Sequence, residues 1–122
     1  DFIKKYQGQR LTDPVGLWRG QCVSIVKRWL SENKWPARRG NAIQWAYGDK
    51  NYKYIKNTAT TLPKPGDIAI FSTGQYGHIG VVSTATLKTM NVFQQNDPIG
   101  SAAKVKGYNY LRPKCVGFLR KI

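Results

Sequence analysis

The sequence predicts an α+β domain in which helices come first and strands follow. Three observations indicate this: the chain has the length of one domain, the apolar residues of its first third recur at helical spacing, and short β-type runs follow Pro65-Gly66. A hydrophobic content of 41% with 12% aromatic residues suits a packed core despite the net charge of +14. We therefore expect residues 1–122 to form a single domain, with N-terminal helices packed on a mostly antiparallel sheet of five or six strands.

The first third of the chain contains the predicted helices. Phe2, Ile3 and Tyr6 fall at helical spacing before Gly8. In a second, longer helix the apolar residues recur at i, i+3, i+4, i+7 and i+8: Cys22, Ile25, Val26, Trp29 and Leu30. Residues 41–46 can form one more short helix.

The rest of the chain is predicted as loop followed by strands. Residues 48–66 carry Gly, Asn, Thr and Pro with scattered Tyr and Lys, which favours a loop. Five β-type runs follow, separated by Gly, Pro and Asn: 67–71, 78–83, 89–95, 103–108 and 115–119.

Cys22 is a candidate nucleophile because of its position on the predicted helix. In the first helical turn its sulfur lies near unpaired N–H groups and the positive end of the helix dipole, which favours the thiolate. It also begins the apolar stripe, so it faces the sheet. The competing interpretation is an inert packed thiol, or a disulfide with Cys115, which otherwise is predicted to be a small buried side chain in a strand.

The single histidine, His78, opens the second β-type run. If this run and the next form a hairpin that turns at Leu87, His78 pairs with Asn96 at a Cβ separation of roughly 4.5 to 5.5 Å, with Gln94 one diagonal step away. A slip of one residue would send both amides to the other face.

Cysteine, histidine and asparagine in this order supply a nucleophile, a base and an amide that orients the imidazole. Such a site performs acyl transfer on amides. Gln21 is placed to stabilise the oxyanion together with the Cys22 backbone N–H. The predicted catalytic residues are Cys22, His78, Asn96, Gln94 and Gln21.

Five motifs in order resemble the CHAP family, the cysteine- and histidine-dependent amidohydrolases/peptidases of bacterial cell-wall enzymes and phage lysins. They are Gly20-Gln21-Cys22, Lys64-Pro65-Gly66-Asp67-Ile68-Ala69-Ile70-Phe71, Gly77-His78-Ile79-Gly80-Val81-Val82, Gln94-Gln95-Asn96 and Gly117-Phe118-Leu119-Arg120. The resemblance implies a papain-like fold, peptidoglycan as substrate, Cys22 as nucleophile and His78 as base. It also implies action outside the cell or at the cell wall, by an amidase or an endopeptidase.

The sequence departs from the family at two places. Family members often carry Glu where Gln94 stands, so the orienting role falls to Asn96, and Asp97 is the nearest acid that can compensate. Some phage members bind calcium through acids before the nucleophile, but only Asp13 matches, and calcium takes six to eight oxygen ligands. We expect no calcium site, no zinc site and no cofactor, because two Cys and one His do not make a structural zinc site.

The charge points to a polyanionic partner. Six cations follow the last acid, Asp97: Lys104, Lys106, Arg112, Lys114, Arg120 and Lys121. For a lysin the partners are peptidoglycan and anionic wall polymers, and we expect a monomer without a membrane span. The alternative is a basic, aromatic-rich module that binds nucleic acid or wall polymer without catalysis. A glycosidase needs a pair of acids at a suitable separation, and none stands out; Asp67 after Pro-Gly is expected to be structural.

Overall fold

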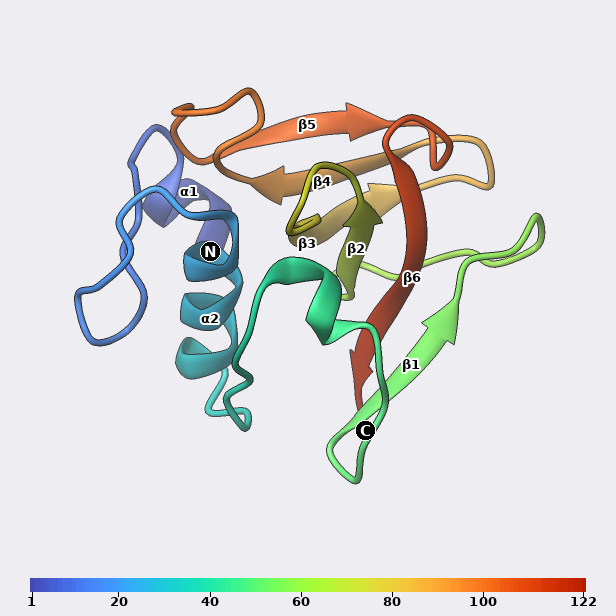
Figure 1. Cartoon of the computed structure of the whole chain (residues 1–122), viewed down its shortest axis with the longest axis horizontal. Coiled ribbons are helices and arrows are strands. Elements are labelled where there is room, and N and C mark those ends of the chain that lie inside the picture. The colour runs from blue at the N-terminus through green and yellow to red at the C-terminus, as the bar shows by residue number, and fades with distance from the viewer.

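The computed structural model describes residues 1–122, and its helices precede its strands as expected (Figure 1). The helical elements are α1 (Phe2–Tyr6), α2 (Cys22–Glu32) and the 3₁₀ helix η1 (Ala42–Trp45). The strands are β1 (Tyr52–Lys56), β2 (Ile68–Ser72), β3 (His78–Ala85), β4 (Met90–Gln94), β5 (Lys104–Tyr108) and β6 (Lys114–Lys121).

No helix has the length and apolar composition needed to cross a membrane.

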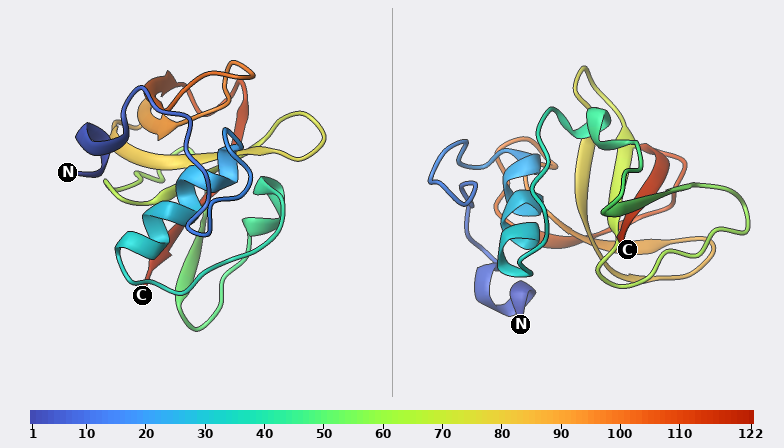
Figure 2. Two further views of the ribbon diagram at one scale, coloured as in Figure 1. Left: turned by 90° about the vertical axis from the view of Figure 1, so that its left-hand side faces the viewer. Right: turned by 90° about the horizontal axis from the view of Figure 1, so that it is seen from below.

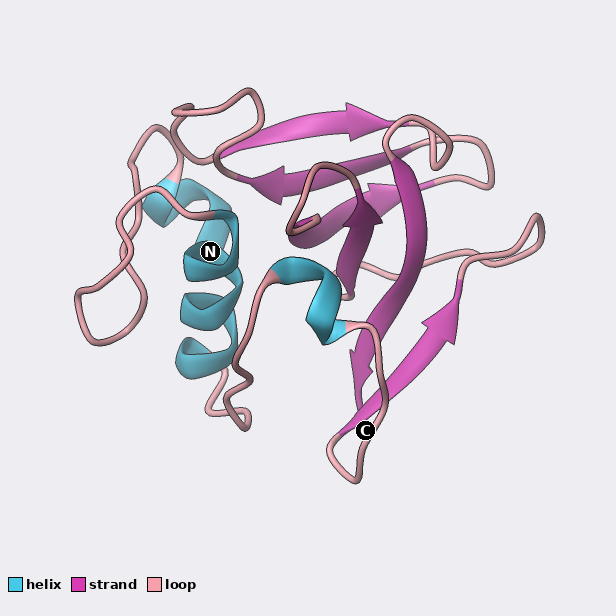
Figure 3. Cartoon of the chain, viewed as in Figure 1, coloured by secondary structure: helices cyan, strands magenta, loops and turns pink.

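The six strands form one sheet in the order β1-β6-β2-β3-β4-β5, and every neighbouring pair is antiparallel (Figure 3). Helix α2 packs against β3 and β4 on one side of this sheet (Figure 2). The fold is α+β, with the helices before the strands and an antiparallel sheet, as predicted. The arrangement brings the start of α2 to the start of β3.

Two apolar clusters cover the two faces of the sheet. The larger one lies under the helices and contains Ile25, Val26 and Leu30 of α2 with Ile68 and Ile70 of β2. The smaller one, on the opposite face, includes the alternate residues of the same strand, 69 and 71. Because side chains alternate along a strand, β2 is buried on both faces, which explains its unbroken apolar sequence.

The prediction of a loop throughout residues 48–66 was wrong at β1. This strand pairs with β6 at the edge of the sheet, with Tyr54 opposite Leu119. Tyr52 is 1% exposed and its hydroxyl donates to the Pro36 carbonyl. The Asn and Lys residues in and around this segment favoured a loop in the prediction, because an edge strand keeps polar residues on its exposed face.

The predicted register of the β3–β4 hairpin is correct in its middle, where Val81 pairs with Phe93 and Val82 with Val92. The pairing does not reach His78 and Asn96, however. Strand β4 ends at Gln94, and the chain turns away through Asn96, whose φ is 72°. The expected cross-strand pair of His78 and Asn96 therefore does not form.

Asp67 serves the turn before β2, as expected. Its carboxylate accepts the N–H of Lys64 at 2.8 Å and two hydrogen bonds from the Arg120 guanidinium at 2.9 and 2.7 Å. The side chain is 4% exposed, so these bonds satisfy a carboxylate that has little access to water. They tie the start of β2 to the end of β6.

Candidate active site

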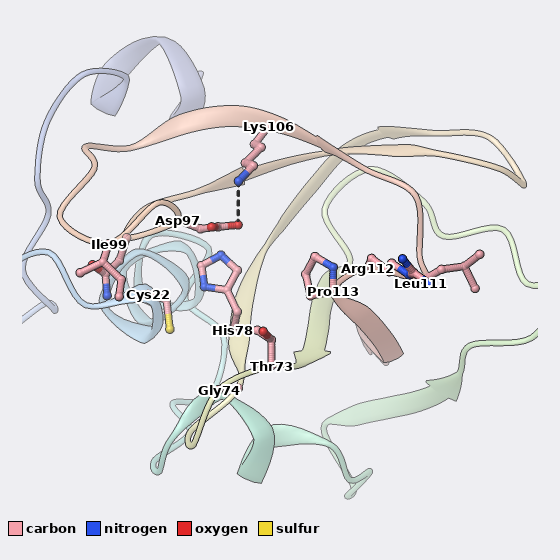
Figure 4. Close-up of a pocket in the computed structure, with 12 residues that line it drawn as sticks. Cys22, Thr73, Gly74, His78, Asp97, Ile99, Lys106, Leu111, Arg112 and Pro113 are labelled. Carbon is pink, nitrogen blue, oxygen red and sulfur yellow. Dashed lines mark ion pairs between the residues drawn. The ribbon is translucent and has the colours of Figure 1, made fainter.

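A cleft of about 650 Å³ lies where the start of α2, the start of β3 and the segment after β4 meet (Figure 4). It is lined by Cys22 and His78, and by Asn96 and Asp97 after β4. Lys106 of β5 and residues 111–113 before β6 complete the far side. The cleft thus brings together the cysteine, the histidine and one of the amides that the sequence predicted.

Cys22 is the first residue of α2, and the extended backbone of Gln21 precedes it. Its thiol is free and half-buried. Burial raises the pKa of this thiol, and the backbone N–H groups of Ile79, Val23 and Cys22 itself act in the opposite direction. The expected effect of the helix start is thus present, but burial outweighs it. At neutral pH the sulfur rests as a thiol.

His78 is 6% exposed, and its Nε2 lies 3.0 Å from Oε1 of Gln94. An amide oxygen only accepts, so this contact assigns the proton of the neutral ring to Nε2 and leaves Nδ1 as the acceptor. In Figure 4 one ring nitrogen lies on the side of Cys22 and the other on the side of Asp97. Burial lowers the pKa of His78, so the neutral ring predominates.

Two glycines bring His78 and Gln94 to this position. Gly77 has a φ of 78°, and a Cβ there would lie 2.8 Å from the Ile43 nitrogen and the Phe71 oxygen. At Gly80 a Cβ would lie 2.9 Å from the Cβ of Gln94. The glycines on either side of His78-Ile79 therefore allow the close approach of neighbouring chain segments.

The ring partner differs from the one expected. Gln94, not Asn96, accepts the hydrogen bond, while Oδ1 of Asn96 accepts the N–H of Gly100 at 2.8 Å. The Gln94 amide is completely buried, and its Nε2 donates to the Asp97 carbonyl at 3.3 Å. Both ends of this amide are engaged, so it holds one orientation toward His78. Asn96 remains in the cleft wall, where its side-chain oxygen binds Gly100 and not the ring.

Gln21 is exposed, and its side chain makes no capping hydrogen bond to α2. Its carbonyl accepts a hydrogen bond from Nε2 of Gln95 at 2.8 Å. The same Gln95 amide exchanges two hydrogen bonds with Leu11, at 2.8 and 3.0 Å. Gln95 therefore anchors the segment that carries the nucleophile. This role was not predicted from the sequence, although a second amide beside Gln94 was the available signal.

Neither the second cysteine nor Asp13, which stands where some family members have a calcium ligand, supplies a group to the cleft. Cys115 is 1% exposed and free, and burial raises its pKa to about 12. Oδ1 of Asp13 accepts the N–H groups of Val15 and Leu17. The guanidinium of Arg28 donates to the carbonyls of Thr12 and Asp13, so a cationic side chain occupies this turn.

Comparisons with known proteins identify the family to which the sequence is similar. The sequence pattern of the CHAP domain matches residues 12–96. Over 97 residues the chain is 35% identical to the endolysin LysK of Staphylococcus phage K. The matched region covers 69% of this chain and 19% of LysK. The chain thus spans about a fifth of that curated relative.

Two solved structures have a similar fold, which agrees with the predicted papain-like α+β fold. The wild-type endolysin LysIME-EF1 matches with a TM-score of 0.66 at 24% identity, over 82% of this chain and 52% of that one. The structure of Ly7917 matches with a TM-score of 0.68 at 10% identity, over 98% of this chain and 60% of that one.

Proposed function

The chain belongs to the CHAP domain family, and we propose that it is a peptidoglycan hydrolase that cleaves an amide bond by thiol catalysis. We further propose that residues 1–122 act as one catalytic domain. The observation that carries the proposal is the cleft that Cys22 and His78 line together, in which Gln94 binds the far nitrogen of the imidazole. The likeness to a phage endolysin supports peptidoglycan as the substrate.

In the proposed reaction the Cys22 sulfur attacks the carbonyl carbon of the scissile amide while Nδ1 of His78 takes the thiol proton. The tetrahedral intermediate places its oxyanion near the backbone N–H of Cys22 and the free side chain of Gln21. The C–N bond then breaks, and the imidazolium gives its proton to the leaving amine. A water, deprotonated by His78, hydrolyses the thioester and regenerates the thiol.

The resting charges favour general-base catalysis over a preformed ion pair. Burial raises the pKa of Cys22 and lowers the pKa of His78, so both groups are neutral before substrate arrives. Gln94 steadies the ring in the tautomer that leaves Nδ1 free. We propose Gln94 as the main orienting amide and retain Asn96 as a secondary polar group of the cleft wall.

The decisive experiment compares two cysteine variants in a turbidity assay on purified cell walls. Cys22→Ala or His78→Ala should lower wall lysis by at least about a thousandfold, because the nucleophile or its base is lost. Cys115→Ala is the matched control, since it makes the same chemical change outside the cleft. Near-normal lysis by folded Cys22→Ala would overturn the proposed mechanism.

The bond that is cut distinguishes two forms of the proposal. An amidase separates the sugar from the stem peptide, whereas an endopeptidase cuts within the stem or the cross-bridge. Mass spectrometry of the digested wall identifies the new amino termini and therefore assigns the bond. Release of reducing sugar ends would instead indicate a glycosidase and contradict thiol catalysis.

The second candidate function is a basic binding module without catalysis, which the net charge of +14 favours. Its partner would be an anionic wall polymer at the cell surface, or a nucleic acid. In that case Cys22→Ala changes nothing, whereas reversing the charges of Lys104, Lys106 and Lys114 abolishes binding. We favour the enzyme, because the module does not explain the cleft around His78.

A further inference from the structure

A cluster of three polar side chains lies beside His78, on the side away from the thiol. Asp97 follows β4, while Lys106 and Tyr108 lie two residues apart on β5 and therefore on the same face. Oδ2 of Asp97 accepts the Tyr108 hydroxyl at 2.6 Å and lies 3.0 Å from Nζ of Lys106. The dashed line in Figure 4 marks this ion pair.

This cluster connects to the imidazole in two ways. The Asp97 carbonyl accepts the Gln94 amide, whose oxygen binds Nε2 of His78. The Tyr108 ring packs at a tilt against Phe71, with the ring centroids 4.6 Å apart, and its centroid lies 6.4 Å from that of the His78 ring. Figure 4 shows the Asp97 carboxylate and the Cys22 sulfur on different sides of the imidazole. The Asp97 backbone therefore binds Gln94, and the Asp97 carboxylate lies on the side of the imidazole away from Cys22.

We propose that Asp97 is a positioning residue of this site: its carbonyl fixes the Gln94 amide, and its carboxylate stabilises the imidazolium that forms when His78 takes the thiol proton. Tyr108 and Lys106 hold the carboxylate in place. The role in the reaction rests on the proposed function, whereas the effect on His78 does not depend on it.

The physical need for this charge follows from the burial of His78. An amide such as Gln94 orients the ring but carries no net charge, so it compensates a buried imidazolium only weakly. Burial tends to raise the pKa of Asp97, but the hydrogen bonds from Tyr108 and Lys106 outweigh it and hold that pKa below its usual value. Asp97 is consequently ionised whenever His78 is active.

The charged and titratable groups around His78 shift its pKa in opposite directions. Burial is the largest effect and lowers the pKa of His78. The negative charge of Asp97 raises this pKa, and the positive charge of Lys106 lowers it further. The Cys22 thiol faces the ring from α2 and Tyr108 from β5, and both are neutral at the working pH. Arg112 lies across the cleft. Asp97 is thus the acid that lines this cleft, and its ion pair moderates its effect.

The test is a titration of His78 by NMR in the full chain. Because His78 is the single histidine, its imidazole signal is unambiguous and needs no activity. Asp97→Asn should lower the pKa of His78 by about 0.5 to 1 unit, and Lys106→Gln should raise it by a smaller amount. Lys53→Gln is the control: it makes the same charge change on β1, at the other edge of the sheet from β5, and should shift the pKa of His78 by less than about 0.2 unit.

The acid limb of the pH profile of kcat/KM should move in the same directions, because it reports the same imidazole. Shifts of the same sign in Asp97→Asn and Lys106→Gln, or no shift in either, would overturn the proposal. If Asp97→Asn alone fails to fold, the double variant Asp97→Asn/Lys106→Gln replaces it, and its His78 pKa should lie below that of Lys106→Gln; equal values would overturn the proposal. Wall lysis that survives Cys22→Ala refutes the proposed function but leaves this titration unaffected.

Discussion

Replacing Gln94 by glutamate tests whether the structure assigns the correct partner to His78. The Gln94 oxygen lies 3.0 Å from Nε2 and the side chain is 0% exposed, so Gln94→Glu places a full negative charge against a buried ring. At a charge separation of about 4 Å and an effective dielectric constant of about 20, the attraction to an imidazolium is about 4 kcal/mol. This corresponds to about 3 pKa units.

Two costs reduce that gain. The new carboxylate is itself buried, and it loses the hydrogen bond that the Gln94 amide donates to the Asp97 carbonyl. We therefore expect a net increase of about 1 to 2 units in the pKa of His78. NMR titration of the single imidazole measures this shift, and Gln7→Glu, an exposed position after α1, is the matched control.

The same substitution weakens the pH dependence of stability that His78 causes. In the wild type, the pKa of folded His78 lies below its unfolded value. Its contribution is thus complete above about pH 6.5 and is lost as the pH falls toward the folded pKa. In Gln94→Glu the folded pKa is higher than in the wild type, so less stability is lost as the pH falls below about 6.5.

Urea unfolding at pH 5.5 and 8.5 measures this difference. Gln94→Glu should be less destabilised relative to the wild type at the lower pH, because the new carboxylate stabilises the protonated ring. A titration of His78 within about 0.3 unit of the wild type would show that Gln94 does not contact the ring. A downward shift would contradict the assignment as well.

Two further predictions concern side chains outside the imidazole pair. Burial raises the pKa of Cys115 to about 12, so at pH 7.5 on the order of one molecule in 30,000 carries the thiolate. Iodoacetamide should therefore add one group, at Cys22, and mass spectrometry should find no early adduct on Cys115. Asp67→Ala removes three hydrogen bonds, two of them from Arg120, and should lower the free energy of unfolding by about 2 to 3 kcal/mol in urea titrations. The folded protein should still lyse walls, whereas its loss of activity would make Asp67 part of the site.

Much of the fold was predictable because its signals are local. The apolar stripe from Cys22 to Leu30 follows the helical period, and it correctly indicated the start of α2 and the face that packs on the sheet. Short β-type runs separated by Gly, Pro and Asn likewise predicted five of the six strands. The edge strand Tyr52–Lys56 was not predicted, because only its pairing with β6 distinguishes it from a loop.

The sequence by itself determined the family, the order of helices and strands, and the meeting of Cys22 with His78 in one cleft. Tertiary structure alone decided which amide binds the ring. Strand β4 stops at Gln94 and the backbone turns through a positive φ at Asn96, so the expected residue leaves the face of His78. Burial, which also depends on the whole fold, offsets the effect of the helix start on the thiol. Periodicity places a side chain on a face, but hydrogen-bond partners and pKa values depend on where strands end and what covers them.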